Sequence, residues 1–191
     1  MVLRQKKKRG LKFGFEIQNA TMIGRGLESN KGLISFKNGA EGKLRNNLFY
    51  NQKKGIDLEG SYNDKDCFTL LTKSRISISH NVFYHIHSEK EEVDVSQLIK
   101  TRKSKKTDKK GDKVFLLNYF KINENIMNDL GIKQYPIQII PTKLHGHTTY
   151  QNVDGWFENV KYFGAFSSNQ NSNWAKWSIL FKNIKEAKTP V

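Results

Sequence analysis

Gly, Asn and Asp interrupt this chain at short intervals, and the interruptions limit what it can fold into. The segments between them are rich in Phe, Ile, Val and Tyr, which favour β-strands. Several segments alternate apolar and polar residues, as a strand does when only one face of its sheet is buried. We therefore expect strands at residues 12–18, 33–37, 48–51, 68–72, 75–79, 82–87, 113–122, 137–142, 143–151, 161–166 and 175–184.

Helical signals are few. Asp94 and Gln97 form a capping box ahead of Leu98, and Asn123 is placed to cap a short helix through residue 130 that Gly131 ends. No internal repeat of useful length is visible, and 191 residues suit one domain. The sequence thus predicts a mainly β (α+β) fold over residues 1–191: a curved antiparallel sheet or partly open pseudo-barrel with two or three short helices.

The formal net charge is +15 and the pI is near 9.8. A small protein tolerates this self-repulsion best when an anionic partner cancels it, and nucleic acid is the leading partner. We expect DNA, with RNA as an alternative, and a homodimer is compatible with the sequence. A membrane surface is disfavoured because no long basic amphipathic helix and no run of eighteen apolar residues is visible.

The N-terminal stretch begins with basic residues and has no apolar segment of the kind found in secretion signals. Cys67 is the single cysteine, which excludes a disulfide framework within the chain and a cysteine-rich zinc module. We therefore expect a soluble cytoplasmic protein.

Residues 100–113 hold eight Lys or Arg and two Asp in fourteen positions. We expect a lysine-rich loop between a helix and a core strand. In that strand, Val114, Leu116, Phe120 and Ile122 would share one face. Its role is either to follow phosphates, with a steep salt dependence, or to remain a solvated loop. Lysine and arginine candidates for phosphate contact are Lys6, Lys7, Lys8, Arg9, Arg25, Lys103, Lys105, Lys106, Lys109 and Lys143.

Sequence-specific recognition needs aromatic and polar groups near this charge. Trp156 and Trp174 lie beside turn residues in the C-terminal third, and Tyr150 precedes them. Aromatic rings of this kind stack on a flipped or unpaired base, so these residues are candidates for a base pocket, with packing as the alternative. Trp177 alternates with polar neighbours and is expected in the core.

The segments "KGDKVFLLN" and "WAKWSILFKNI" resemble the PUA-like, EVE and YTH group of base-reading domains. In that group a Gly-Asp pair precedes a buried strand, and a late strand bearing Trp closes the barrel. The resemblance covers about the last 80 residues, and it implies a pocket for a modified or flipped base, as in the targeting domains of some restriction systems. The chain departs from the pattern at "INENIMNDLGI", where the group continues with a strand.

Two His-x-His pairs are candidate metal ligands. Residues two apart on a strand share a face, so His85 with His87, and His145 with His147, would hold zinc or iron if the two strands adjoin. Glu89 would complete such a site. The alternative is that these histidines contact phosphate or lie at the surface.

An acidic cluster contains two of the candidate catalytic residues, Tyr62 and Asp64. Asp57, Glu59, Tyr62, Asp64 and Asp66 fall within ten residues of a basic protein. A restriction endonuclease would use such carboxylates to hold Mg²⁺. However, the acid-x-Lys pair that this chemistry needs is missing, since Leu71 stands two residues before Lys73.

Half-pipe DNA glycosylases of restriction systems offer a metal-free alternative. The chain resembles them in its small size, its basic, β-rich character, and in Arg25 followed by Tyr62, although their late His-x-x-Asp pair is absent. An Asn- and Asp-rich turn also accounts for the acidic cluster.

The sequence therefore predicts a DNA-binding protein of a restriction or defence system. The alternatives are a small restriction endonuclease or DNA glycosylase, in which Tyr62, Asp64, His145 and His147 act, and an RNA-binding protein. Mg²⁺ or Zn²⁺ would be the cofactor of a metal-dependent enzyme, whereas the glycosylase alternative is metal-free and binding alone requires none.

Overall fold

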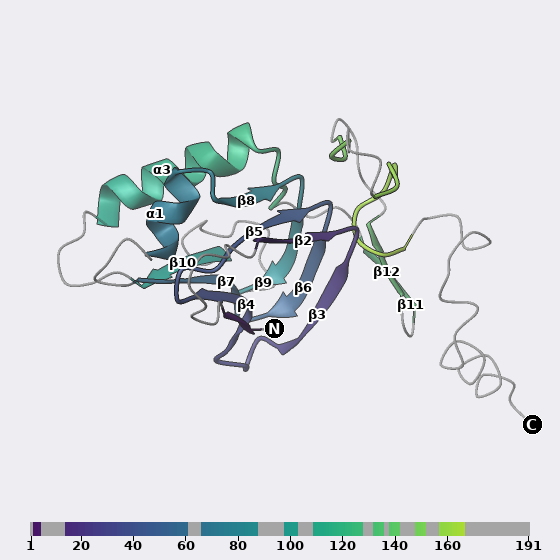
Figure 1. Ribbon diagram of the computed structural model, residues 1–191. Helices are drawn as coiled ribbons and strands as arrows, with labels where there is room; N and C mark the ends of the chain where they lie inside the picture. Colours follow the sequence, from purple (N-terminus) through teal and green to yellow (C-terminus); the bar gives the residue numbers. More distant parts are fainter. Residues whose placement is uncertain are drawn as a thin grey trace, which may run out of the picture.

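The chain winds through three sheets in turn and returns to each of them one strand further along (Figure 1). The computed structural model describes residues 2–4, 14–60, 66–87, 98–102, 109–127, 132–135, 138–141, 148–151 and 157–166. The elements are β1 (Val2–Arg4), β2 (Gly14–Gln18), β3 (Thr21–Gly26), β4 (Gly32–Lys37), β5 (Glu41–Arg45), β6 (Leu48–Gln52), β7 (Lys54–Glu59), α1 (Cys67–Thr72), β8 (Ile76–Ser79), β9 (Val82–Ile86), β10 (Ile99–Arg102), α3 (Lys109–Ile122), β11 (Ile132–Tyr135) and β12 (Gln138–Pro141).

These three sheets are parallel. Their strand orders are β1-β4-β7-β10, β2-β5-β8 and β3-β6-β9, so each turn of the chain adds one strand to every sheet. The body is therefore a short parallel β-helix. The prediction of a curved antiparallel sheet or pseudo-barrel was wrong, because apolar and polar residues alternate in the same way whether the neighbouring strand is parallel or antiparallel. Among the described residues, only the β11–β12 hairpin is antiparallel.

Unequal coil lengths conceal the structural repeat in the sequence. Hydrogen bonds between equivalent turns join residues 27 apart, from Ala20 to Asn47, and then residues 34 apart, from Asn47 to Asn81. The longer step includes α1, which is inserted between β7 and β8. A search for a fixed period therefore misses the coils, although the strands stack in register.

Inward-facing side chains from successive coils build one core. In the β2-β5-β8 sheet, Ile17, Leu44 and Ile78 occupy the same register position, and in the β3-β6-β9 sheet Phe49 pairs with Phe83. The rings of Phe49 and Phe83 stack with centroids 4.8 Å apart. Like side chains thus lie above one another along the axis of the coils, and the apolar interior continues from coil to coil.

Helix α3 packs on the end of this core. Its residues Leu116 and Phe120 are buried one turn apart, and the Phe120 ring lies 5.3 Å from that of Phe83. Val114 and Ile122, which a strand would place on the same face, are 53% and 78% exposed. The predicted strand at 113–122 was therefore wrong, because the apolar residues also fit a helical period of four.

Other sequence-based assignments have mixed outcomes. The strands predicted at 12–18, 33–37, 48–51, 75–79, 82–87 and 137–142 correspond to β2, β4, β6, β8, β9 and β12. The strand predicted at 68–72 is helix α1, and no strand occurs in the described residues of 143–151 and 161–166. In place of a helix beginning at Asn123, residues 123–127 form a turn and a single bridge of Ile126 to Val82. The capping box at Asp94, the strand at 175–184 and the segment "WAKWSILFKNI" lie outside the described residues.

Stacked asparagines hold one corner of the coils together. Asn81 Oδ1 accepts from the backbone N–H and the side-chain amide of Asn47, both at 3.0 Å. The side-chain amide of Asn81 donates to the Leu44 carbonyl at 2.9 Å, and the backbone N–H of Asn81 donates to Asn125 Oδ1 at 3.1 Å. The asparagine ladder, Asn47, Asn81 and Asn125, satisfies buried backbone groups that the turn leaves without a strand partner.

No helix among the described residues is long and apolar enough to cross a bilayer.

Asn81→Ala should lower the free energy of unfolding by about 3 kcal/mol, because it removes the acceptor of the buried Asn47 backbone N–H and one hydrogen bond each of the Asn47 side-chain amide and the Leu44 carbonyl. Urea denaturation measures the change. The matched control is Asn118→Ala on the exposed side of α3, which should alter stability by less than about 0.5 kcal/mol. Equal effects of the two substitutions would contradict a structural role for the ladder.

Candidate functional site

A groove of about 440 Å³ lies beside the first parallel sheet, where the turn from β3 to β4 meets the sheet surface. Its lining is mostly polar and includes three basic side chains and one carboxylate. We call it the basic groove, and its residues are Ile23, Gly24, Arg25, Ser29, Asn30, Lys31, Gly32, Leu33, Ser35, Lys37, Gln52 and Asp57.

The buried side chain of Gln52 shapes the wall of the basic groove. Its Oε1 accepts from the backbone N–H of Arg25 at 2.7 Å, and its Nε2 donates to Ser29 Oγ at 3.0 Å and to the Lys31 carbonyl. These contacts fold residues 26–31 back toward β6. Gly24 permits the close approach, since a Cβ there would lie 2.2 Å from the Asn51 carbonyl oxygen. The positions of Arg25 and Lys31 are thus set by one amide.

The floor of the basic groove comes from two neighbouring coils. Ser35 on β4 and Asp57 on β7 are register partners, and both lie on the opposite face of the sheet from the core residues Ile34 and Ile56. Asp57 is only 5% exposed. Lys37 lies two residues beyond Ser35, on the same face of β4. A buried carboxylate therefore lies among basic side chains that reach solvent.

The acidic cluster does not converge on one point in the part of the chain that the structure describes. Asp57 lines the groove, whereas Glu59 Oε2 accepts from the Asn38 N–H at 3.3 Å. Asp66 caps helix α1, with Oδ2 accepting from the Thr69 N–H at 3.1 Å. Two of these acids thus have local structural roles. The candidate catalytic residues Tyr62 and Asp64 lie outside the described residues.

The first His-x-His pair lies at β9. The His85 ring stacks on Tyr84 at a centroid distance of 4.1 Å, and on Tyr50 at 5.8 Å, while His87 is exposed. His85 therefore belongs to an aromatic stack on the β3-β6-β9 sheet. The described residues contain no group of three His, Cys, Asp or Glu side chains that could hold a metal ion. His145, His147 and Glu89 lie outside them.

Of the phosphate-contact candidates, Arg25 lines the basic groove and is exposed. Lys109 is the first residue of α3, so the lysine-rich segment 100–113 begins within β10 and ends within a helix. The remaining basic candidates lie outside the described residues: Lys6, Lys7, Lys8, Arg9, Lys103, Lys105, Lys106 and Lys143.

Tyr150 packs against the corner of the coils instead of the groove. The Arg45 guanidinium carbon lies 3.9 Å from the centre of its ring, and Arg45 is also paired with Glu16 at 2.7 Å. The Tyr150 backbone exchanges two hydrogen bonds with the side chain of Asn46. The described contacts of Tyr150 are therefore those of a packed residue. Trp156, Trp174 and Trp177 lie outside the described residues.

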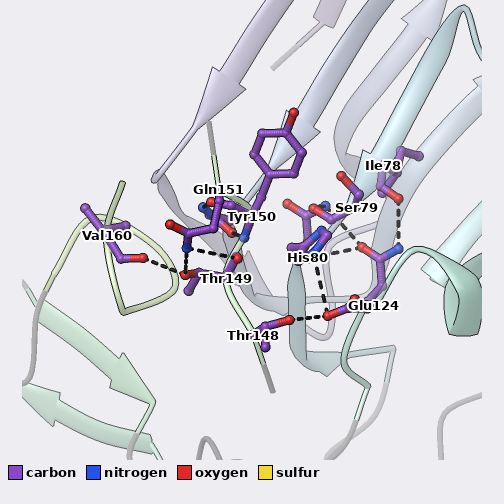
Figure 2. Close-up of polar contacts among 12 residues, drawn as sticks. Ile78, Ser79, His80, Glu124, Thr148, Thr149, Tyr150, Gln151 and Val160 are labelled. Atoms are coloured by element: carbon purple, nitrogen blue, oxygen red, sulfur yellow. Dashed lines mark hydrogen bonds and ion pairs between the residues drawn. The ribbon is translucent and has the colours of Figure 1, made fainter. Parts of the chain in front are cut away.

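His80 occupies the same corner, and Figure 2 shows it joined to Thr148 through Glu124. His80 has a φ of 54°, in the left-handed region that Asn19 and Asn46 occupy in the preceding turns. Its Nε2 lies 3.5 Å from Glu124 Oε2. Burial lowers the pKa of His80 below 6.5, helped by the positive charge of Arg45 and opposed by Glu124.

Sequence reasoning missed Lys31, Lys37 and Gln52 as groove residues. Lys37 gave a signal, because Ser35 and Lys37 alternate with the core residues Ile34 and Phe36. Gln52 gave none, because its role depends on a contact with a turn more than twenty residues earlier.

Comparison with protein-family models, with curated proteins and with solved structures finds no significant match for this chain.

Acidification should destabilise the protein through His80. Because the folded-state pKa lies below the unfolded value of about 6.5, the unfolded chain binds more protons in this range, and stability falls as the pH drops below 6.5. His80→Asn should remove the contribution of His80 to the pH dependence of stability. The variant should fold, since asparagine holds the equivalent left-handed position in two other turns. Urea denaturation between pH 5 and 7.5 measures it. His87→Asn, at an exposed site, should retain the wild-type pH dependence; identical profiles for the two variants would contradict the assignment.

Proposed function

We propose that this protein binds nucleic acid, DNA in the first instance, with the basic groove as a contact site. The observation that carries the proposal is the placement of Arg25, Lys31 and Lys37 around one polar groove in a chain of net charge +15. A phosphate backbone is the polyanion that such a surface attracts most generally.

The exposure of the basic side chains favours this function. Arg25 and Lys31 are exposed and Lys37 is half-buried, so each can meet a phosphate without a large desolvation cost. Contacts of this kind release condensed counterions, which makes binding fall steeply as salt rises. They also provide affinity without sequence selectivity. The lysine-rich segment 100–113 is a second source of such contacts in the proposal.

A matched pair of double variants tests the groove. Lys31→Gln/Lys37→Gln should weaken binding to all sequences and reduce the slope of log K against log salt by about two units, one for each lost phosphate contact. Lys73→Gln/Lys121→Gln removes the same charge at exposed positions on α1's C-terminal cap and on α3. Fluorescence anisotropy with labelled duplex DNA, single-stranded DNA and RNA measures both, from 50 to 300 mM salt.

The control variant should retain the wild-type slope. Equal slopes for the two double variants would contradict the basic groove as the contact site. Replacement of Lys103, Lys105, Lys106 and Lys109 by Gln in the same assay then measures the contribution of the lysine-rich segment.

Two further assays identify the class of ligand and test for enzymatic activity. If heparin competes as well as DNA per unit charge, the surface is a general polyanion binder. Incubation of the labelled duplex with and without Mg²⁺, followed by alkali, tests the restriction endonuclease and DNA glycosylase alternatives. Strand cleavage that depends on Mg²⁺ would indicate the former, and cleavage only after alkali the latter. A role in a restriction or defence system is proposed on the sequence alone.

A further inference from the structure

We propose that the outward side of helix α3 binds the surface of an anionic lipid bilayer. This inference goes beyond the proposed function and does not depend on it, because no residue of α3 is among those that line the basic groove.

The buried side of α3 fixes the orientation of the helix. Leu116 and Phe120 are only 2% and 1% exposed, and the Phe115 ring packs edge-on against Phe68 of α1 at a centroid distance of 5.4 Å. Figure 1 shows α3 at the edge of the molecule, outside the sheets. The side of the helix opposite Leu116 and Phe120 is therefore turned toward solvent.

Large apolar side chains are exposed on this outward side. Val114 is 53% exposed, Leu117 42% and Ile122 78%. Among the described residues, only Ile23 is another exposed hydrophobic residue of this size. Val114 and Leu117 lie one turn apart and are neighbours on the helix surface, and Ile122 is the last residue of the helix. Exposed aliphatic side chains gathered on one element indicate an interaction surface, whereas isolated ones are ordinary.

Positive charge accompanies these apolar side chains. Lys121 is exposed, lies one turn beyond Leu117 and precedes Ile122. Segment 100–113, with its eight Lys or Arg, leads directly into the helix. Aliphatic side chains can enter the boundary between headgroups and acyl chains, while ammonium groups remain among anionic headgroups. An anionic bilayer therefore complements both the charge and the apolar character of this side of α3.

Other partners match only part of this surface. A nucleic-acid backbone would attract Lys121 but offers no apolar phase to Ile122. A second copy of the chain would cover the apolar side chains, but it would bring the lysines of two α3 helices together, and like charges repel. The sequence analysis disfavoured a membrane because no basic amphipathic helix was visible. Residues 113–122 were predicted as a strand, and only the structure shows the helix.

Co-sedimentation with lipid vesicles tests the proposal. Wild-type protein should bind vesicles of two parts phosphatidylcholine to one part phosphatidylglycerol at least about tenfold more tightly than vesicles of phosphatidylcholine alone. The triple variant Val114→Gln/Leu117→Gln/Ile122→Gln should lose about tenfold in affinity for the anionic vesicles, because glutamine is compatible with the helix but has no apolar group to insert. Its affinity for DNA, measured by anisotropy, should stay within about twofold of wild type.

The matched controls lie away from α3. Ile23→Gln removes an apolar side chain that is as exposed as Val114 but belongs to β3, and it should change vesicle affinity by less than about twofold. Lys121→Gln and Lys31→Gln each remove one exposed charge, the first from α3 and the second from the basic groove. Lys121→Gln should weaken vesicle binding about fivefold, and Lys31→Gln by less than about twofold.

A second measurement does not depend on the folding of the triple variant. An environment-sensitive fluorophore attached to Leu117→Cys should shift its emission to the blue on anionic vesicles, whereas the same label on Ile23→Cys should not. Cys67 is buried and should remain unlabelled.

Several results would overturn the proposal. Wild-type protein that shows no preference for anionic vesicles, or a label at residue 117 whose emission does not change, excludes the bilayer contact. A folded triple variant that loses DNA affinity in parallel would assign this side of α3 to the nucleic-acid surface instead. A wild-type dimer that becomes a monomer in the triple variant, measured by sedimentation velocity, would assign it to a second copy of the chain.

Discussion

The asparagine ladder is the interaction on which the arrangement of the coils depends. A parallel β-helix turns sharply between its sheets, and every turn leaves backbone groups without a strand partner. Asn47, Asn81 and Asn125 satisfy these groups and link each coil to the next at about 3 Å. Since Asn125 follows α3, the ladder also returns the chain to the stack after the helix. The three asparagines thus contribute both to the stability of the turns and to the register between successive coils.

The candidate site is a consequence of that stacking. Ser35 and Asp57 meet only because β4 and β7 lie in register on adjacent coils, and the groove wall forms only because Gln52 holds the turn before β4. Groove residues are therefore distributed over more than thirty positions in the sequence. Their mutual geometry is set by the strand register and by the contacts of Gln52 with the turn before β4.

The corner between the second and third sheets is covered by residues 148–151 and 157–166. Phe163 packs with Leu48, Val82 and Ile126, and the Gly164 N–H donates to the Asn46 carbonyl at 2.7 Å. This covering segment buries the corner at which His80 and Arg45 lie, which explains the lowered pKa of the histidine. The part of the chain that the structure describes therefore has two distinct polar regions: the open basic groove and the covered corner around Tyr150.

The β-rich character, the positions of six strands and the excess of positive charge could all be predicted from the sequence. These follow from local alternation and composition, which a single segment carries within itself. The tertiary structure alone decided that the sheets are parallel, that residues 109–122 form a helix, and that Asp57 shares a groove with Lys31 and Lys37. The physical reason is that alternation reports which side of a strand is buried, but not which strand lies beside it. Coil steps of 27 and 34 residues place the partners far apart at unequal intervals, so only the folded chain brings them together.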